Sequence, residues 1–155
     1  MSLLSQSIAS PGGAVVTAMH VKPYTAEWLA QPTAYLRLVV DNLGPEVSDW
    51  WEGPCNPRHA TVILADGAAL VWDEESGWRL GRYVSGCRDE HTELSGVRYL
   101  GGGLLPRPER VPTSLSDARA GVGTSSAWRP SYRSHRSCHD GFGNALFYYG
   151  ECVQA

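Results

Sequence analysis

The sequence lacks any apolar run near the roughly 20 residues that a membrane-spanning helix needs. Its start, residues 1–13, has no basic group ahead of an apolar stretch, so we expect no signal peptide and a cytoplasmic location. There is no internal repeat and little net charge, which is −3 over 155 residues. Such a balance predicts no general affinity for nucleic acid or for anionic membranes.

Cysteine is scarce, and no two of the four residues form a Cys-x2-Cys pair. Without a secretory signal, reduced thiols are the expectation. Two looser clusters leave a zinc hypothesis open, with the candidate ligands Cys87, His91, His135 and Cys138. A catalytic thiol would need a neighbouring base, as in Cys138 with His139 or Cys87 with His91. Neighbours along a strand rarely point at each other, so we predict no catalytic residues. Because the candidate zinc ligands are scattered, we also predict no metal, and we predict no cofactor.

Other signatures of catalysis are weak. The glycines at 101–103 lack the Lys-Ser/Thr pair and the helix that complete a phosphate-binding loop. Asp73, Glu74 and Glu75 could suggest metal binding or acid–base chemistry. Three carboxylates at the tip of a hairpin are more typical of a solvated turn, and we interpret them in that way.

Aromatic residues are plentiful but uneven, with six Trp and seven Tyr against two Phe. These rings need both apolar packing and a partner for their N–H or O–H group, as at interfaces or pocket walls. The composition therefore favours binding. One hypothesis is a small-molecule site walled by Trp50, Trp51, Trp72 and Trp78.

The clearest local pattern predicts a β-hairpin over residues 68–83. Leu70 to Trp72 form an apolar run, and Trp78 and Leu80 alternate with polar neighbours as in a half-buried strand. Between them lies a polar loop that ends in Gly77, which can adopt a positive φ. We expect the rest of the chain to pack around this hairpin.

The other elements follow from periodicity and from prolines and glycines. A helix is predicted from about Pro32 to Leu43, where Gly44 and Pro45 stop it. Further strands are predicted at residues 47–52, 59–65 and 94–100, and a second helix at 111–120. Short connections require antiparallel pairing. The predicted fold is α+β, with an antiparallel sheet of three to five strands, a helix before it and a shorter helix after it, packed as a two-layer sandwich.

Three segments also carry a family resemblance. They are residues 34–36 (A-Y-L), residues 70–78 (L-V-W-D-E-E-S-G-W) and residues 99–109 (Y-L-G-G-G-L-L-P-R-P-E). In this order, residues 33–120 resemble an uncharacterised domain family common in actinobacteria. The resemblance implies a small intracellular domain of unknown function and no catalytic assignment. Members of that family usually stop near Gly121.

We therefore expect a flexible lead at residues 1–18, a single domain at 19–121 and an extension at 122–155. Truncation after Gly121 is predicted to leave a cooperatively folding domain. Within the extension, residues 145–149 have the composition of a strand and could add an edge to the sheet.

Residues 125–139 contain three arginines, two histidines and no acidic residue. Trp128 and Tyr132 lie among Arg129, Arg133 and Arg136, a mixture that single-stranded nucleic-acid sites use. Three arginines are few for a strong electrostatic footprint, so we interpret the segment as a solvated, partly ordered extension and keep nucleic-acid binding as the alternative.

The sequence most favours a non-enzymatic protein-interaction or adaptor module. Residues 19–108 carry 8 basic and 12 acidic side chains, a net charge of −4, so we expect a protein partner. The alternatives are a nucleic-acid-binding accessory protein that uses the tail, and a small-molecule-binding domain. The candidate binding residues are Trp50, Trp51, Trp128, Arg129, Tyr132, Arg133 and Arg136.

Overall fold

The computed structural model describes residues 21–53, 56–88 and 90–154. The predicted lead at residues 1–18 lies outside this range. The chain divides into two compact units, one formed by residues 35–137 and the other by the described parts of 1–34 and 138–155. The predicted boundary at Gly121 concerns folding and stays a prediction.

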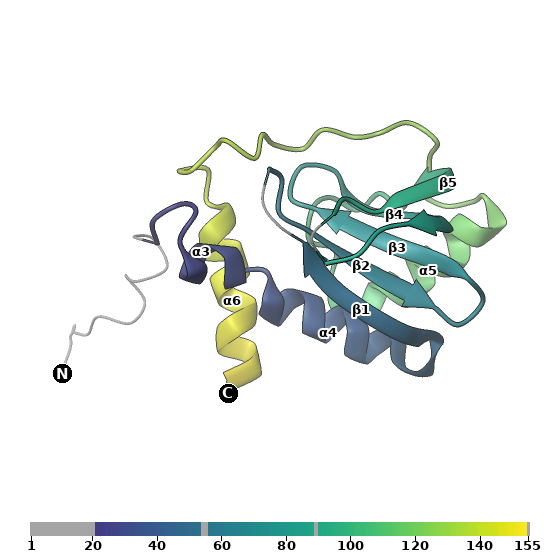
Figure 1. The fold of residues 1–155 in the computed structure, drawn as a ribbon, viewed down its shortest axis with the longest axis horizontal. Coiled ribbons are helices and arrows are strands. Elements are labelled where there is room, and N and C mark those ends of the chain that lie inside the picture. Colours follow the sequence, from purple (N-terminus) through teal and green to yellow (C-terminus); the bar gives the residue numbers. More distant parts are fainter. Residues whose placement is uncertain (1–20, 54–55, 89, 155) are drawn as a thin grey trace. The chain divides into compact units, whose positions relative to one another are not determined.

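One antiparallel sheet contains five strands in sequence order (Figure 1). These strands are β1 (Val47–Gly53), β2 (His59–Leu64), β3 (Ala68–Asp73), β4 (Gly77–Ser85) and β5 (Glu93–Tyr99). The predicted hairpin is confirmed as β3 and β4, in which Trp72 is paired with Trp78. Gly77 closes the turn with a φ of +73°, a conformation that glycine adopts without steric cost.

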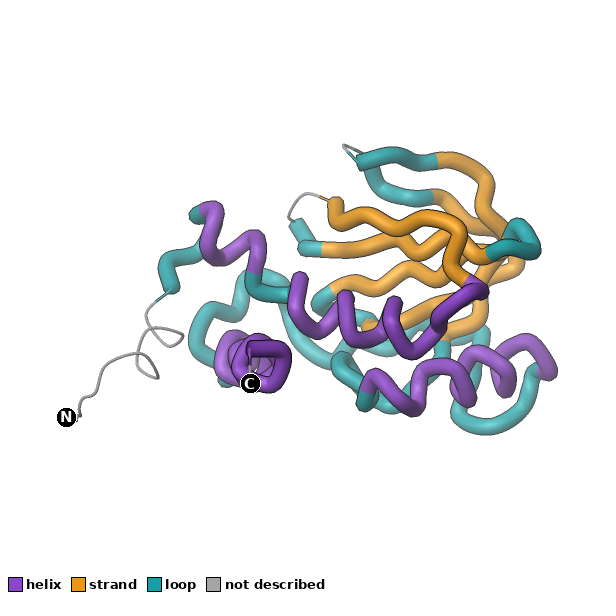
Figure 2. The backbone as a smooth tube through the Cα atoms, turned by 90° about the horizontal axis from the view of Figure 1, so that it is seen from below, coloured by secondary structure: helices purple, strands orange, loops and turns teal. Residues whose placement is uncertain are grey.

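Two helices of the 35–137 unit cover one face of this sheet (Figure 2). They are α4 (Thr33–Leu43), followed by the 3₁₀ turn η2 (Gly44–Glu46), and α5 (Val111–Ala120), preceded by η3 (Pro108–Arg110). Both predicted helices and the α+β class are confirmed. The core between the layers contains the buried residues Tyr35, Leu36, Val39, Val62, Leu70, Trp72, Leu80 and Leu115.

The three family-like segments meet in this core through hydrogen bonds. The Tyr35 hydroxyl donates to the Pro106 carbonyl at 2.6 Å and accepts from Trp78 Nε1 at 3.1 Å. Trp72 Nε1 donates to the Leu104 carbonyl at 2.8 Å. Buried Tyr and Trp rings need such partners for their polar atoms. These hydrogen bonds therefore hold the helix α4, the β3–β4 hairpin and the loop at 104–106 together.

The second unit contains α3 (Ala26–Ala30) and α6 (Phe142–Gln154). The expectation that residues 145–149 form a strand is wrong, because they lie inside α6. The Asp140 carboxylate accepts a hydrogen bond from the Phe142 N–H two residues later, as in an Asx turn, and the Ala145 N–H donates to the Gly141 carbonyl at the start of the helix. This start signal overrides the strand propensity of the aromatic residues. None of the described helices is both long and apolar enough to cross a membrane.

The fully buried hairpin tryptophans should dominate the stability of the fold. Trp72 and Trp78 are 0% and 1% exposed, so Trp72→Ala or Trp78→Ala should lower the free energy of unfolding by about 3–5 kcal/mol, through lost burial and a cavity. Urea unfolding measures this change. Trp128→Ala is the matched control, because Trp128 is 85% exposed and its loss should change stability by less than about 0.5 kcal/mol. Equal stability of all three variants would remove the hairpin from the core.

Candidate functional site

At the tip of the β3–β4 hairpin, residues 73–76, three residues are buried and Glu75 is half-buried. The exposed fractions of Asp73 and Glu74 are 2% and 0%, and that of Ser76 is 2%. The interpretation of the three carboxylates as a solvated turn is therefore wrong. Buried carboxylates are stable only when other groups donate hydrogen bonds to them or carry opposite charge, and the surrounding chain supplies both.

Arg58, which precedes β2, holds the Glu74 carboxylate. Its backbone N–H donates to Oε2 at 2.6 Å, and its guanidinium donates to Oε1 through Nε at 3.1 Å and Nη2 at 2.8 Å. The Arg58 side chain is 4% exposed and that of Glu74 is 0% exposed. Charge-assisted hydrogen bonds of this kind offset the desolvation of both ions. The sequence analysis missed Arg58, which has no special neighbour along the chain.

Asp73 is held in a similar way by its own hairpin. Its Oδ1 accepts from the backbone N–H groups of Glu75 at 2.8 Å and Ser76 at 2.7 Å. Its Oδ2 accepts from Arg79 Nη1 at 2.7 Å. Asp73 therefore fixes the turn in the manner of an Asx turn and also carries an ion pair.

Residues 126–137, named the strap here, dock against this tip. Arg129 donates to the Ser76 hydroxyl through Nε at 2.7 Å and lies 3.5 Å from Asp73 Oδ2. Arg133 Nη1 donates to Glu74 Oε1 at 2.9 Å. His135 contacts Glu75 Oε2 through both its backbone N–H and its ring Nδ1, each at 2.8 Å. Three successive carboxylates thus receive three successive basic residues.

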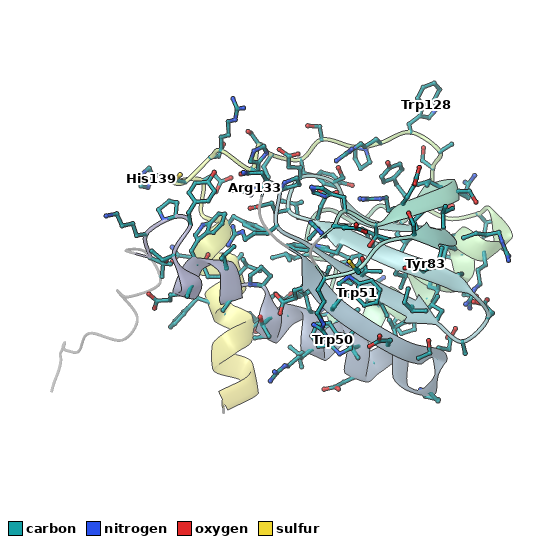
Figure 3. All side chains as sticks on the ribbon, in the orientation of Figure 1. Trp50, Trp51, Tyr83, Trp128, Arg133 and His139 are labelled. Atoms are coloured by element: carbon teal, nitrogen blue, oxygen red, sulfur yellow. The ribbon has the colours of Figure 1, made fainter. Side chains whose placement is uncertain are left out.

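The main chain of the strap is also held. Ser126 and Tyr99 exchange two backbone hydrogen bonds, at 2.7 and 2.9 Å, and form an isolated antiparallel bridge beside β5. The Tyr132 N–H donates to the Glu75 carbonyl at 2.9 Å. Between these two points, the Trp128 side chain projects outward and is 85% exposed (Figure 3). Eight of the twelve strap residues are exposed, so the strap is solvated, and these contacts attach it to β5 and to the tip.

The contact between His135 and Glu75 changes the acidity of the carboxyl group. Partial burial acts to raise the pKa of Glu75, but the hydrogen bonds and charge of His135 outweigh it, and the pKa is lowered from 4.5. The ionised Glu75 therefore stabilises the folded state at pH values above 4.5, and this contribution is lost as the pH falls through the lowered pKa.

The four tryptophans proposed as walls of a small-molecule site do not share a surface. Trp72 and Trp78 are buried in the core. Trp50 pairs with Val62 and Trp51 with Thr61, so the two side chains point to opposite faces of the sheet. Figure 3 labels both residues on β1. The structure thus does not bring this set together, whereas it does bring Arg129 and Arg133 together at the tip.

The candidate zinc ligands have other surroundings. The His91 ring stacks on His59, with ring centroids 4.5 Å apart, and His135 contacts Glu75. The thiols of Cys87 and Cys138 are exposed and form no disulfide. Over the described ranges, no three His, Cys, Asp or Glu side chains are grouped so that they could hold a metal ion.

The sheet face opposite the helices carries a buried histidine, His59, which is 4% exposed. Its Nε2 has no hydrogen-bond partner within the described part of the chain, and neither has Trp51 Nε1. A Cβ atom added at Gly53 would lie 1.8 Å from His59 Nε2, so the ring packs directly against that glycine. We assign this histidine a structural role.

Arg133 should contribute strongly to stability, because it is the buried basic residue of the strap. Its side chain is 8% exposed, so Arg133→Ala should lower the free energy of unfolding by about 3 kcal/mol, the low end for a broken buried pair, since Arg58 stays on Glu74. Chemical unfolding measures the change. Arg107→Ala removes the same charge from a side chain that is 74% exposed and should change stability by less than about 0.5 kcal/mol. Similar losses in the two variants would contradict the pairing.

His59 should make stability depend on pH. Burial lowers the pKa of His59 from 6.5, and the Pro57 and Glu90 backbone groups only partly oppose this. The unfolded chain therefore binds this proton more readily, so stability should fall as the pH drops below about 6.5. Urea midpoints from pH 8 to pH 5 test this sign. His59→Gln should flatten the profile in this window, whereas Arg107→Ala, which removes an exposed charge elsewhere, should not. An unchanged slope in His59→Gln would refute the assignment.

Comparison with known proteins identifies a family for the sheet and its two covering helices. No curated protein and no solved structure matches the chain. One family model matches residues 35–117, which span most of α4, the whole sheet and most of α5. The match ends before the strap begins. On this match, the chain belongs to DUF6292, a family of unknown function.

Proposed function

We propose that this protein is a non-enzymatic, cytoplasmic protein-interaction module that uses the strap as its binding surface and Trp128 as the main contact. The observation that carries the proposal is an exposed tryptophan on a fixed backbone. Trp128 is 85% exposed, while Ser126 on one side is bound to Tyr99 of β5 and Arg129 on the other is bound to Ser76 of the tip. Tryptophan is enriched among the residues that dominate binding energy at protein interfaces.

Fixing the strap favours affinity. A side chain presented by an ordered backbone loses less conformational freedom on binding than one on a flexible tail. Tyr132 adds a second aromatic ring that is 43% exposed, and its backbone N–H is also held by the tip. The surface can therefore bury apolar area on a partner without first ordering its own main chain.

The charge arrangement favours a protein over a nucleic acid as the ligand. Nucleic-acid binding draws its affinity from cations that neutralise phosphates. In the strap, Arg129, Arg133 and His135 already contact Asp73, Glu74 and Glu75. Transfer of these cations to phosphates would break the contacts that they make at the tip, and Arg58 and Arg79 alone would then balance the buried Glu74 and Asp73. This internal neutralisation supports the protein-interaction proposal over a nucleic-acid site in the tail.

The test is capture of partners from the native host by the immobilised full-length protein, in roughly 0.3 M salt to screen exposed charges. A partner of the strap should be retained by the wild type and by Tyr148→Ala, and lost by Trp128→Ala. Tyr148 is a matched control because it is 61% exposed and lies in the other unit. With the purified partner, Trp128→Ala should weaken affinity about 30-fold or more, as expected for a central contact.

Two results would contradict the proposal. One is equal affinity of the wild type and Trp128→Ala for every purified partner. The other is submicromolar, salt-sensitive binding to random single-stranded oligonucleotides that is abolished when Arg129, Arg133 and Arg136 become Ala. That second result would favour the nucleic-acid alternative, because counterion release gives phosphate contacts their strong salt dependence.

A further inference from the structure

We propose that the hairpin tip is a binding site for an arginine-containing basic segment of a partner protein, and that the strap occupies this site within the same chain. The inference concerns a surface other than Trp128 and does not depend on the function proposed above. It rests on three features. Groups outside the strap orient Asp73 and Glu74, the tip contacts the strap mainly through side chains, and the strap has no regular secondary structure.

The tip is oriented by groups outside the strap. Arg58 holds both oxygens of Glu74, and Arg79 together with two backbone N–H groups holds Asp73. These donors come from the segment before β2, from β4 and from the turn itself. Asp73 and Glu74 therefore keep their positions when the strap leaves, which is the preorganisation that a binding site requires. The Glu75 carboxylate, in contrast, is held by His135 of the strap.

The strap shows how the site selects its ligand. Arg129 reaches Ser76 and Asp73, Arg133 reaches Glu74, and His135 reaches Glu75. The spacing Arg-x3-Arg-x-His matches consecutive residues of the tip. Arg133 Nη1 also lies 3.3 Å from the Glu74 carbonyl oxygen, so one guanidinium contacts both the side chain and the backbone of Glu74. Arginine suits such sites because its planar group donates several hydrogen bonds in fixed directions.

The occupant has the character of a bound peptide. From residue 127 to residue 141 the backbone forms neither helix nor strand. Among the described contacts of strap and tip, one joins two main chains, from Tyr132 N–H to the Glu75 carbonyl, and the others involve side chains. Another chain with the same side-chain spacing can make the same contacts.

The ligand must be a different protein and not a second copy of this chain. A covalently attached segment competes at an effective concentration in the millimolar range. An identical strap from a second copy, present at micromolar concentration, makes the same contacts and cannot displace it. A foreign segment succeeds when it adds contacts outside the tip. Binding of the foreign segment would release the strap. The foreign segment and any ligand of the Trp128 surface would therefore weaken each other's binding by the same factor.

The experiment adds a fluorescent peptide with the sequence of residues 126–137 to the full-length chain and follows anisotropy. Arg129→Ala/His135→Ala loosens the strap but keeps the buried pair of Arg133 and Glu74. This variant should bind the peptide at least about tenfold more tightly than the wild type, because the fraction of open sites sets the apparent affinity. Arg107→Ala, which removes an exposed charge elsewhere, should bind as the wild type does.

The specificity of the site is tested with altered peptides. A peptide with Ala in place of both arginines should not bind, and a scrambled peptide of equal charge should bind at least about tenfold more weakly than the native order. The proposal is overturned if the loosened variant retains a cooperative melting transition but does not bind, or binds the scrambled peptide equally well. Strap exchange between copies, seen as a dimer of the loosened variant by light scattering, would overturn the assignment to a foreign partner.

Discussion

A carboxylate with no exposed surface, that of Glu74, connects most of the features of this domain. It lies at the turn between β3 and β4, and it accepts hydrogen bonds from Arg58 before β2 and from Arg133 in the strap. An unpaired ion at this depth would be strongly unfavourable. Arg58 supplies the pairing within the sheet, and Arg133 adds a second basic group from the strap, so segments that are distant in the sequence meet at the hairpin tip.

The same contacts determine what the surface can offer to other molecules. They neutralise a basic segment that would otherwise favour phosphate, and they hold the backbone on either side of Trp128. Below the tip, the hydrogen bonds among Tyr35, Trp78 and Pro106 join three segments within the residues that the family model matches. The match thus covers the core, whereas the strap lies outside the matched residues.

Periodicity was enough to predict the hairpin, the helices around it and the antiparallel sheet, because each depends on local spacing and on Pro and Gly stops. The burial of Glu74 was not predictable in this way, since it depends on Arg58 and Arg133, which are 16 and 59 residues away. One signal was present: three successive carboxylates and, far along the chain, three basic residues at short spacing. The helix at 142–154 was missed because composition was considered without the Asx turn before it.

The central claim is that strap and hairpin form one folded unit, and native-state hydrogen exchange tests it most directly. The backbone N–H groups of Ser126, Tyr132 and His135 donate hydrogen bonds to Tyr99 or Glu75. The account predicts that these amides exchange far more slowly than in an unstructured peptide and lose protection together in Arg133→Ala, while hairpin amides stay protected. Exchange of the three amides at the rate of an unstructured chain in the wild-type protein would contradict it.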